Sequence, residues 1–235
     1  TRATKLSCIL PAYNEAPRIG AVLDAVLATP EIDEVIVVDD GSTDATVEVV
    51  QRRLSPRVRL TLLRQLHNGG KTRAVAAGLR RARGGHVMLI DSDLSGLAPR
   101  HLAALAEPVL SGLAGVSISL RGNAPRSWRA LGLDYISGER VMPRALLADR
   151  LDALDRLPRF GLEVFMNRLW LEQGLDIAVV RWPEVASPLK SQKHGGILAG
   201  LGADLAMMGD IFETITPVAA LGQIRAMRAR RIQEA

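Results

Sequence analysis

Short runs of apolar, mostly β-branched residues alternate with amphipathic stretches through the first half of the chain. The apolar runs predict strands at residues 6–10, 35–38, 58–63 and 87–90. Between them, apolar positions recur every three or four residues, which predicts helices at 19–27, from Thr43 or Asp44 to Leu54, and at 71–81. This alternation is typical of βαβ units, so we expect an α/β fold whose mostly parallel, Rossmann-like sheet is flanked by helices.

The second half of the chain has a less regular pattern. It predicts helices at residues 99–110, 144–154 and 162–173, strands at 116–120 and 177–182, and a polar loop at 121–128. A basic loop is expected at 187–196, then an amphipathic helix from Ile197 to Ile215 and a short arginine-rich tail after Pro217. We expect one domain over residues 1–235, with parts at 1–95, 96–196 and 197–235.

The composition agrees with one globular domain. Of 235 residues, 48% are hydrophobic and 23% charged, so the chain can bury a sizeable core without disulfides or a structural metal. The single cysteine, Cys8, excludes an intramolecular disulfide and is expected as a small buried hydrophobe. The sequence contains no run of about 18 uncharged apolar residues, so no membrane span is predicted. Residues 1–5 hold no apolar signal region, and the expected location is therefore cytoplasmic.

The charge balance is basic. The 30 Lys and Arg against 25 Asp and Glu give a net charge of +5, and 26 of the 30 are arginine. This excess permits phosphate-rich or anionic-lipid partners. Because 3% of residues are aromatic and no basic run is interleaved with aromatics, the chain lacks a stacking platform for bases, and no nucleic-acid partner is expected.

Candidate chemistry gathers just after the expected strands, where open α/β sheets bind ligands. Asp91-Ser92-Asp93 follows the fourth strand. Two carboxylates one residue apart can face one hard cation, which favours Mg²⁺ or Mn²⁺. A solvated turn with a helix cap is the alternative for these three residues taken alone.

Two further polar segments fall at the same expected edge. Asp39-Asp40-Gly41-Ser42 follows the second strand, where a carboxylate can accept hydrogen bonds from a base or a ribose, although an N-cap with a glycine turn is the alternative. Asn68-Gly69-Gly70-Lys71 precedes the third helix, so its backbone N–H groups and its lysine suit a diphosphate. No P-loop or G-x-G-x-x-G motif is present, so P-loop hydrolysis and dinucleotide redox chemistry are not supported.

Four motifs in succession resemble those of family-2-type nucleotide-sugar glycosyltransferases with the GT-A fold. They are Pro11-Ala12-Tyr13-Asn14-Glu15, Val37-Val38-Asp39-Asp40-Gly41-Ser42-Thr43-Asp44, Asn68-Gly69-Gly70-Lys71 and Asp91-Ser92-Asp93-Leu94. The resemblance makes residues 1–95 the nucleotide-sugar-binding half. It implies metal binding by Asp91 and Asp93, and nucleotide-sugar contacts by Pro11, Ala12, Tyr13, Glu15, Asp39, Lys71, Asp91 and Ser92.

Two segments of the second half resemble the acceptor side of glucosyl-3-phosphoglycerate synthases, to which polyprenyl-phosphate glycosyltransferases have a related layout. They are Ser137-Gly138-Glu139-Arg140 and Phe160-Gly161-Leu162-Glu163. The chain departs from those synthases in lacking their phosphoglycerate-binding insertion. It also has Val185-Ala186-Ser187-Pro188 where they place a metal-binding histidine, which leaves His194 as the candidate third metal ligand and the acceptor undetermined.

The residues and the resemblance agree on one mechanism. Transfer from a nucleoside diphosphate sugar requires the leaving diphosphate to be neutralised, and a divalent metal with Lys71 supplies that charge. An inverting enzyme needs a carboxylate to deprotonate the acceptor hydroxyl, for which Glu139 is the first candidate, followed by Asp134 and Glu163. A retaining enzyme could use the same glutamates to bind sugar hydroxyls, and Glu163 could instead be an exposed first-turn residue.

The leading hypothesis is therefore a metal-dependent glycosyltransferase using a UDP-sugar, with UDP-glucose as a candidate. The alternatives are a sugar-1-phosphate nucleotidyltransferase, whose glycine- and arginine-rich first loop is missing here, and a non-catalytic nucleotide-sugar-binding module. A further hypothesis is peripheral contact with an anionic membrane, which would bring the site to a lipid-linked acceptor. It rests on the apolar stripe from Ile197 to Ile215 and on Arg225, Arg228, Arg230 and Arg231, although such a stripe also suits a core-facing helix.

Overall fold

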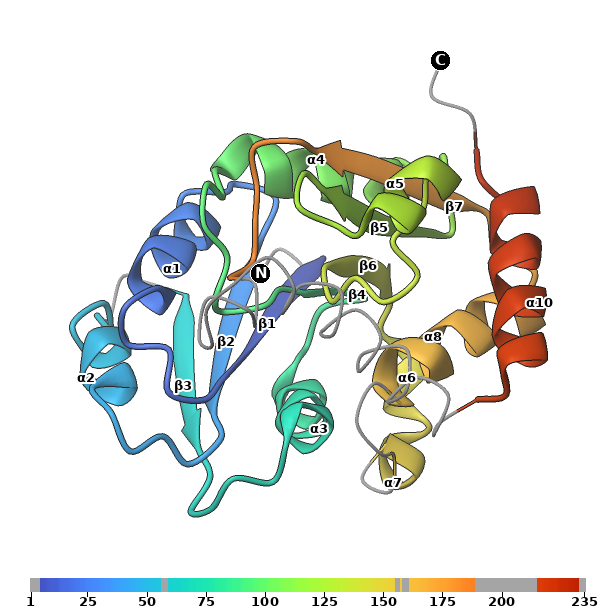
Figure 1. Cartoon of the computed structure of the whole chain (residues 1–235). Coiled ribbons are helices and arrows are strands. Elements are labelled where there is room, and N and C mark those ends of the chain that lie inside the picture. Colours follow the sequence, from blue (N-terminus) through green and yellow to red (C-terminus); the bar gives the residue numbers. More distant parts are fainter. Residues whose placement is uncertain (1–4, 56–58, 155–156, 158–160, 189–214, 233–235) are drawn as a thin grey trace, which may run out of the picture.

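A seven-stranded sheet forms the centre of the computed structural model, which describes residues 5–55, 59–154, 157, 161–188 and 215–232 (Figure 1). The strand order is β3-β2-β1-β4-β6-β5-β7. All neighbouring strands pair in parallel except at β6, which is antiparallel to both β4 and β5. The strands are β1 Leu6–Ala12, β2 Glu34–Asp39, β3 Leu60–Arg64, β4 His86–Leu89, β5 Val116–Arg121, β6 Arg140–Pro143 and β7 Ile177–Trp182.

The strands follow the apolar runs of the sequence closely, and the mostly parallel α/β sheet is confirmed. Only β6 was not predicted, because four residues that include an arginine and a proline carry no strand pattern of their own. Its register is set by its neighbours: Met88 pairs with Val141, and Ile118 pairs with Arg140. This strand is therefore defined by its pairing with β4 and β5 rather than by a pattern of its own.

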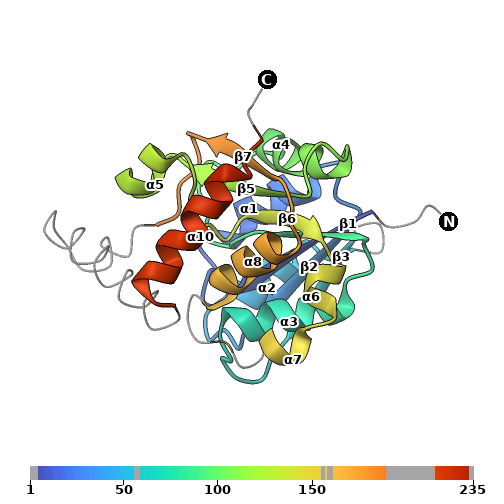
Figure 2. The same cartoon turned by 90° about the vertical axis from the view of Figure 1, so that its right-hand side faces the viewer.

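Helices cover both faces of the sheet. They are α1 Ile19–Leu27, α2 Thr46–Gln51, α3 Lys71–Arg81, α4 Pro99–Leu110, α5 Arg126–Leu131, α6 Ala145–Ala148, α7 Leu151–Leu154, α8 Gly161–Glu172 and α10 Pro217–Ala229. Buried residues of α1, α2 and α4 belong to one apolar cluster, and those of α3, α6, α7, α8 and α10 belong to the other. Figure 2 looks onto the second of these faces.

The two clusters meet the sheet through alternating side chains, as the two-residue period of a strand requires. In β1, Ile9 packs with one cluster, whereas Cys8 and Leu10 pack with the other. Cys8 is buried and free, as expected, and burial raises the pKa of its thiol. No helix within the described ranges is both long enough and apolar enough to cross a membrane.

The second half differs from its predicted elements in three places. The expected loop at 121–128 is present only at residues 122–125, because Arg121 ends β5 and α5 begins at Arg126. The expected helix at 144–154 is two short helices, α6 and α7, with a break at residues 149–150. The expected tail is the helix α10, which packs against α8 through Ile224 and Met227, both largely buried. The amphipathic helix expected from Ile197, and His194, fall outside the described residues.

The topology positions a site at one edge of the sheet. β1 lies between β2 and β4, and the chain moves from one side of β1 to the other between β3 and β4. Residues that follow β1, β2 and β4 therefore meet beyond the carboxyl ends of these parallel strands. This is the topological switch point at which open α/β sheets bind ligands.

Candidate active site

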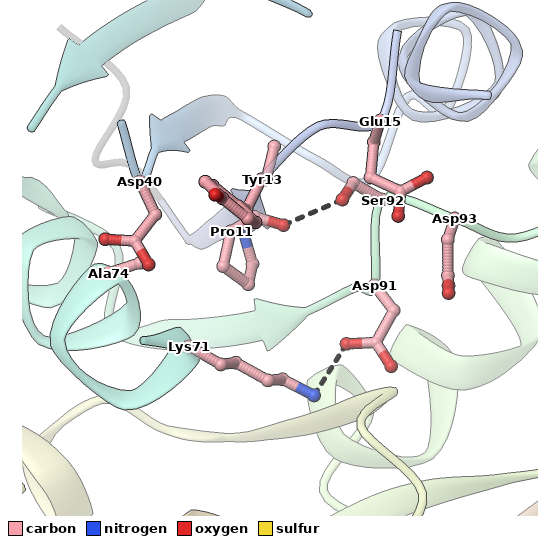
Figure 3. Close-up of a pocket in the computed structure, with 10 residues that line it drawn as sticks. Pro11, Tyr13, Glu15, Asp40, Lys71, Ala74, Asp91, Ser92 and Asp93 are labelled. Atoms are coloured by element: carbon pink, nitrogen blue, oxygen red, sulfur yellow. Dashed lines mark hydrogen bonds and ion pairs between the residues drawn. The ribbon is translucent and has the colours of Figure 1, made fainter. Parts of the chain in front are cut away.

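A pocket of about 230 Å³ opens at this switch point (Figure 3). Four parts of the sequence contribute to it: the end of β1 and its following loop, the end of β2, the start of α3 and the segment after β4. The lining residues are Pro11, Ala12, Tyr13, Glu15, Asp40, Lys71, Ala74, Asp91, Ser92 and Asp93. The structure thus brings together all of the residues that the resemblance assigns to the nucleotide sugar, with the exception of Asp39.

The loop after β1 is fastened by Asn14, whose φ of 54° is the left-handed conformation that asparagine tolerates better than most residues. Its side-chain Oδ1 accepts from the backbone N–H of Thr43 at 2.8 Å, and its own N–H donates to Ser42 Oγ at 2.9 Å. The Glu15 N–H donates to Thr46 Oγ1 at 2.8 Å. These bonds join the loops after β1 and β2 into one wall of the pocket.

Asp40, rather than Asp39, reaches the pocket wall. Its carboxylate accepts from the backbone N–H groups of Gly69 at 2.8 Å and Gly70 at 2.7 Å. The paired glycine amides, which we expected to face a diphosphate, thus bond the carboxylate of Asp40 in this structure, and their contact with a diphosphate stays a prediction. Because Gly70 directly precedes Lys71, these bonds tie the start of α3 to the loop after β2.

Asp39 is 1% exposed and lies at the end of β2, where its Oδ1 accepts from the N–H of Ser42 at 3.3 Å. Its proposed contact with the nucleoside stays a prediction. Sequence reasoning could not choose between adjacent aspartates, because which of the two faces the ligand depends on the strand's pleat and on the neighbouring loop.

Lys71 is the cationic centre of the pocket. Its Nζ lies 2.7 Å from Asp91 Oδ1 and 3.1 Å from Glu163 Oε1 on α8. Burial acts to lower the pKa of the ammonium, but the two carboxylates outweigh burial and raise it above its ordinary value. For Asp91, burial acts to raise the pKa, and Lys71 outweighs burial and lowers it. Lys71 and Asp91 are therefore both charged at neutral pH.

Asp93 has the opposite balance. Burial, together with the charges of Asp91, Glu15 and Glu139, raises the pKa of its carboxyl to about 6. Its Oδ1 is buried and accepts no hydrogen bond from any described residue. Ser92, between the two aspartates, donates from Oγ to the carbonyl of Pro11 at 2.9 Å and so fixes this turn to β1.

The carboxylates of Asp91 and Asp93 suit a divalent cation. An orphaned carboxylate oxygen in a field of like charges gains most from a hard cation, and oxygen donors are what Mg²⁺ and Mn²⁺ prefer. Within the described part of the chain, no three His, Cys, Asp or Glu side chains converge as a ready metal site. Asp91 and Asp93 are therefore the candidate metal ligands among the described residues that line the pocket.

A second carboxylate cluster lies behind Asp91. Glu139 is fully buried, and its Oε2 accepts from the hydroxyls of Ser119 and Ser137, each at 2.7 Å. Arg121 lies 3.5 Å from Glu139 Oε2 and 3.4 Å from Asp134 Oδ2. One oxygen of each carboxylate, Glu139 Oε1 and Asp134 Oδ1, is buried without a hydrogen-bond partner among the described residues.

Burial limits what the three candidate bases can do as they stand. Asp134 and Glu139 are 0% exposed and Glu163 is 4% exposed, and none of them lines the pocket. Glu163 is not the exposed first-turn residue considered above, since it holds Lys71. Burial raises the pKa of Asp134, and the charge of Arg121 opposes that shift. Their catalytic roles stay predictions.

Two residues have contacts that only the tertiary structure makes visible, although Gly138 belongs to the Ser137-Gly138-Glu139-Arg140 motif named above. Arg121 ends β5, and its guanidinium is 13% exposed, with its Nη1 donating to Ser187 Oγ at 2.8 Å. Its importance becomes visible only once β5 and β7 are neighbours, because Asp134 and Ser187 lie far apart in the sequence. Gly138 is the other: a Cβ there would lie 2.6 Å from both Asp91 Oδ2 and Lys71 Nζ.

The chain belongs to the glycosyl transferase family 2, whose model matches residues 7–154. That range holds every motif of the pocket and the carboxylates of Asp91, Asp93, Asp134 and Glu139, whereas Glu163 lies beyond it. The seven-stranded sheet flanked by helices is the GT-A fold.

Individual relatives agree with this assignment. A dolichyl-phosphate beta-glucosyltransferase of Drosophila melanogaster is 41% identical over 102 residues, which cover 38% of this chain and 31% of that relative. Two crystal structures of glucosyl-3-phosphoglycerate synthase from Mycobacterium tuberculosis are 25% identical and cover 90% of this chain. One, with Mn²⁺, UDP and glucosyl-3-phosphoglycerate, has a TM-score of 0.66 over 80% of its own chain. The other, with Mg²⁺ and UDP, has a TM-score of 0.67 over 79%. This chain spans about a third of the length of the curated relatives it matches.

Proposed function

We propose that this protein transfers a sugar from a nucleoside diphosphate sugar, with UDP-glucose as the first candidate donor, in a reaction that depends on Mg²⁺ or Mn²⁺. The observation that carries the proposal is the pocket itself. It combines one lysine with a pair of carboxylates, one of which has a buried oxygen that no described residue bonds. The neighbouring synthase structures, which hold UDP with Mn²⁺ or Mg²⁺, support this choice of donor and metal.

Each residue of the pocket is assigned a proposed role from its position. Asp91 and Asp93 would hold the metal, which when bound neutralises charge on the leaving diphosphate. Lys71 would move from its ion pair with Asp91 to the diphosphate, since a bound cation competes for the same carboxylate. Pro11, Tyr13 and Glu15 would contact the nucleoside, and Glu163 would hold the ammonium of Lys71 at the pocket through their ion pair. Glu139 is the proposed base for an inverting reaction, a role in which its carboxylate, fully buried here, would have to become accessible to the acceptor.

The acceptor is proposed to carry a phosphate. The relatives named above act on dolichyl phosphate or form glucosyl-3-phosphoglycerate, and both names contain a phosphorylated acceptor. A lipid-linked acceptor would place the protein at the cytoplasmic face of a membrane. The exposed Arg225 and Arg228 of α10 could contact anionic lipid there, whereas Arg230 and Arg231 donate to the carbonyls of Gly174 and Leu131.

A donor-hydrolysis panel tests the central proposal. Slow hydrolysis of UDP-, GDP- and other nucleotide sugars is measured with Mg²⁺, with Mn²⁺ and with EDTA, because hydrolysis reports the donor without requiring the acceptor. We expect metal-dependent release of UDP from a UDP-sugar. Metal-dependent UDP binding without turnover on any donor or phosphorylated acceptor would instead indicate a non-catalytic binding module.

The membrane contact has its own test. Full-length protein is sedimented with phosphatidylserine-containing liposomes at low and high salt, beside the Arg225→Glu/Arg228→Glu variant. Both side chains are exposed, so the double variant leaves the packing of α10 intact. Salt-sensitive sedimentation that the variant loses would support the contact, and equal sedimentation of the two proteins would contradict it.

A further inference from the structure

Arg140, the first residue of β6, has a side chain that is fully buried. Burying a guanidinium costs several kcal/mol unless its donors are satisfied. No carboxylate of the described residues lies within ion-pairing distance of it. Burial lowers the pKa of the guanidinium to about 10, and the more distant charge of Glu163 opposes this shift. Other contacts must therefore offset the cost of burying this charged side chain.

Carbonyl oxygens take the place of a paired carboxylate. Nε donates to the backbone carbonyl of Ser137 at 2.7 Å, and Nη2 donates to that of Tyr135 at 3.0 Å. Nη1 donates to Asn167 Oδ1 on α8 at 2.6 Å. The guanidinium carbon also lies 4.8 Å from the centre of the Trp170 ring, a cation–π contact within the dry core.

These bonds hold one particular turn, the segment from Asp134 to Glu139. Asn167 Nδ2 donates to the same Tyr135 carbonyl at 2.9 Å, so Arg140 and Asn167 clamp the turn together. The phenol of Tyr135 donates to Gln223 Oε1 at 2.6 Å, which ties the turn to α10 as well. The helix α10 lies beside α8 (Figure 2). Without the clamp, two buried carbonyls would lose their donors.

The turn abuts the charged centre of the pocket. It carries Gly138, at which even a Cβ would lie 2.6 Å from Asp91 and Lys71, and it carries the hydroxyl of Ser137 that bonds Glu139. A small displacement of the turn would therefore move the Lys71–Asp91 pair. Misplacement of about 1 Å can cost about 100-fold in rate when groups must meet in a fixed geometry.

We propose that Arg140 is a positioning residue: through the carbonyls of Tyr135 and Ser137 it fixes the turn that aligns Lys71, Asp91 and Glu139. The inference rests on the proposed glycosyl transfer at this pocket. Arg140 does not touch the ligands, because its side chain is fully buried and does not line the pocket. Its removal should affect the chemical step more than donor binding, whose nucleoside contacts lie on the loops after β1 and β2.

The test compares kcat and the donor KM of Arg140→Met, Arg140→Lys and wild type. We expect Arg140→Met to lose about 10- to 100-fold in kcat while the donor KM changes by less than about threefold. Arg140→Lys should recover part of the loss, since an ammonium keeps the charge and some of the donors. The matched control is Arg144→Met, which removes a bond to the Gly84 carbonyl beyond the other end of β6 and should keep kcat within about twofold.

Each outcome decides the inference. If Arg140→Met folds and its kcat stays within twofold of wild type, the inference is overturned. The same holds if Arg144→Met loses as much kcat as Arg140→Met, or if Arg140→Met changes only the donor KM. If Arg140→Met does not fold, Asn167→Ala replaces it: a threefold or larger fall in kcat at unchanged KM supports the inference, and unchanged kcat overturns it. A wild-type protein without turnover on any donor overturns the proposed function itself, a separate result.

Discussion

Individual side chains in the pocket are held at a cost to the fold. Asp93 has a raised pKa, since burial and the neighbouring carboxylates disfavour its charged form. The pKa of Asp93 is about 6 in the folded protein and about 4 in the unfolded chain, so the folded protein holds the proton more tightly. The free energy of unfolding therefore falls as the pH rises from about 4 to 6. Above pH 6, Asp93 is charged in the metal-free protein, and the full cost of burying that charge lowers the free energy of unfolding.

Replacing Asp93 by Asn removes that charge. We expect Asp93→Asn to melt above the metal-free wild type at pH 7 by a few degrees, since each kcal/mol shifts Tm by about 2–4 °C in a chain of this size. The difference should shrink as pH falls toward 4, where the wild-type carboxyl is protonated. Thermal unfolding of both proteins in EDTA across this range measures it, and a constant difference at all pH values would contradict the assignment.

The same residue should be needed for catalysis. Asp93→Ala should lose about two or more orders of magnitude in transfer rate, the scale expected when a transition-state electrostatic partner is removed. The measurement is kcat at saturating donor and Mn²⁺. Near-wild-type activity in this variant, or full wild-type activity in excess EDTA, would rule out metal binding by Asp93.

Gly138 gives a steric prediction. Gly138→Ala places a methyl group 2.6 Å from Asp91 and Lys71, so the ion pair must shift, and we expect kcat to fall by about 10-fold or more. Gly85→Ala is the control, because a Cβ there meets nothing within 4 Å. If the two variants have equal rates, the close contact at Gly138 has no part in catalysis.

Among the elements, α10 is part of the core rather than an appendage. Met227 is fully buried and Ile224 nearly so, and both pack in the cluster that contains α8. The backbone after α10 continues this attachment, since the Ile177 N–H donates to the Arg230 carbonyl and the Ile232 N–H to the Ile177 carbonyl, each at 3.0 Å. A test of the α10 arginines by deleting the chain from Gly222 onward would therefore also remove core contacts, whereas substitution of Arg225 and Arg228 leaves Ile224 and Met227 in place.

This packing predicts a large effect from one methionine. Met227→Ala should lower the free energy of unfolding by about 2–5 kcal/mol, through lost burial and the cavity left behind. Val218→Ala, at a side chain that is 81% exposed on the same helix, should change it by less than about 0.5 kcal/mol. Urea unfolding of both variants measures the difference. A small effect at Met227 would show that α10 is docked only loosely.

At the scale of the whole molecule, the fold gathers distant segments around one pocket. The pocket draws on residues from Pro11 to Asp93, and Glu163 of α8 pairs with Lys71, one of the lining residues. A ligand that joins these parts should stabilise all of them together. Binding to the folded state alone contributes about 2.7 kcal/mol at 100 times Kd.

We therefore expect UDP with Mn²⁺ to raise Tm by about 5–10 °C at such a concentration. UDP in EDTA should give a clearly smaller shift, because the metal joins the diphosphate to Asp91 and Asp93. Differential scanning fluorimetry with and without EDTA measures both. An identical shift in the two conditions would contradict a shared metal–diphosphate site.

The amino-acid sequence by itself determined the alternation of strands and helices, the buried free Cys8 and the gathering of chemistry after β1, β2 and β4. These features are local, since apolar periodicity and motif order need no knowledge of distant neighbours. Only the tertiary structure decided which aspartate meets the glycine amides, that α10 completes the core, and that β6 exists. It also brought Arg121, Gly138 and Arg140 to the site. Each depends on segments far apart in sequence, because burial and close contact arise only when the sheet has assembled.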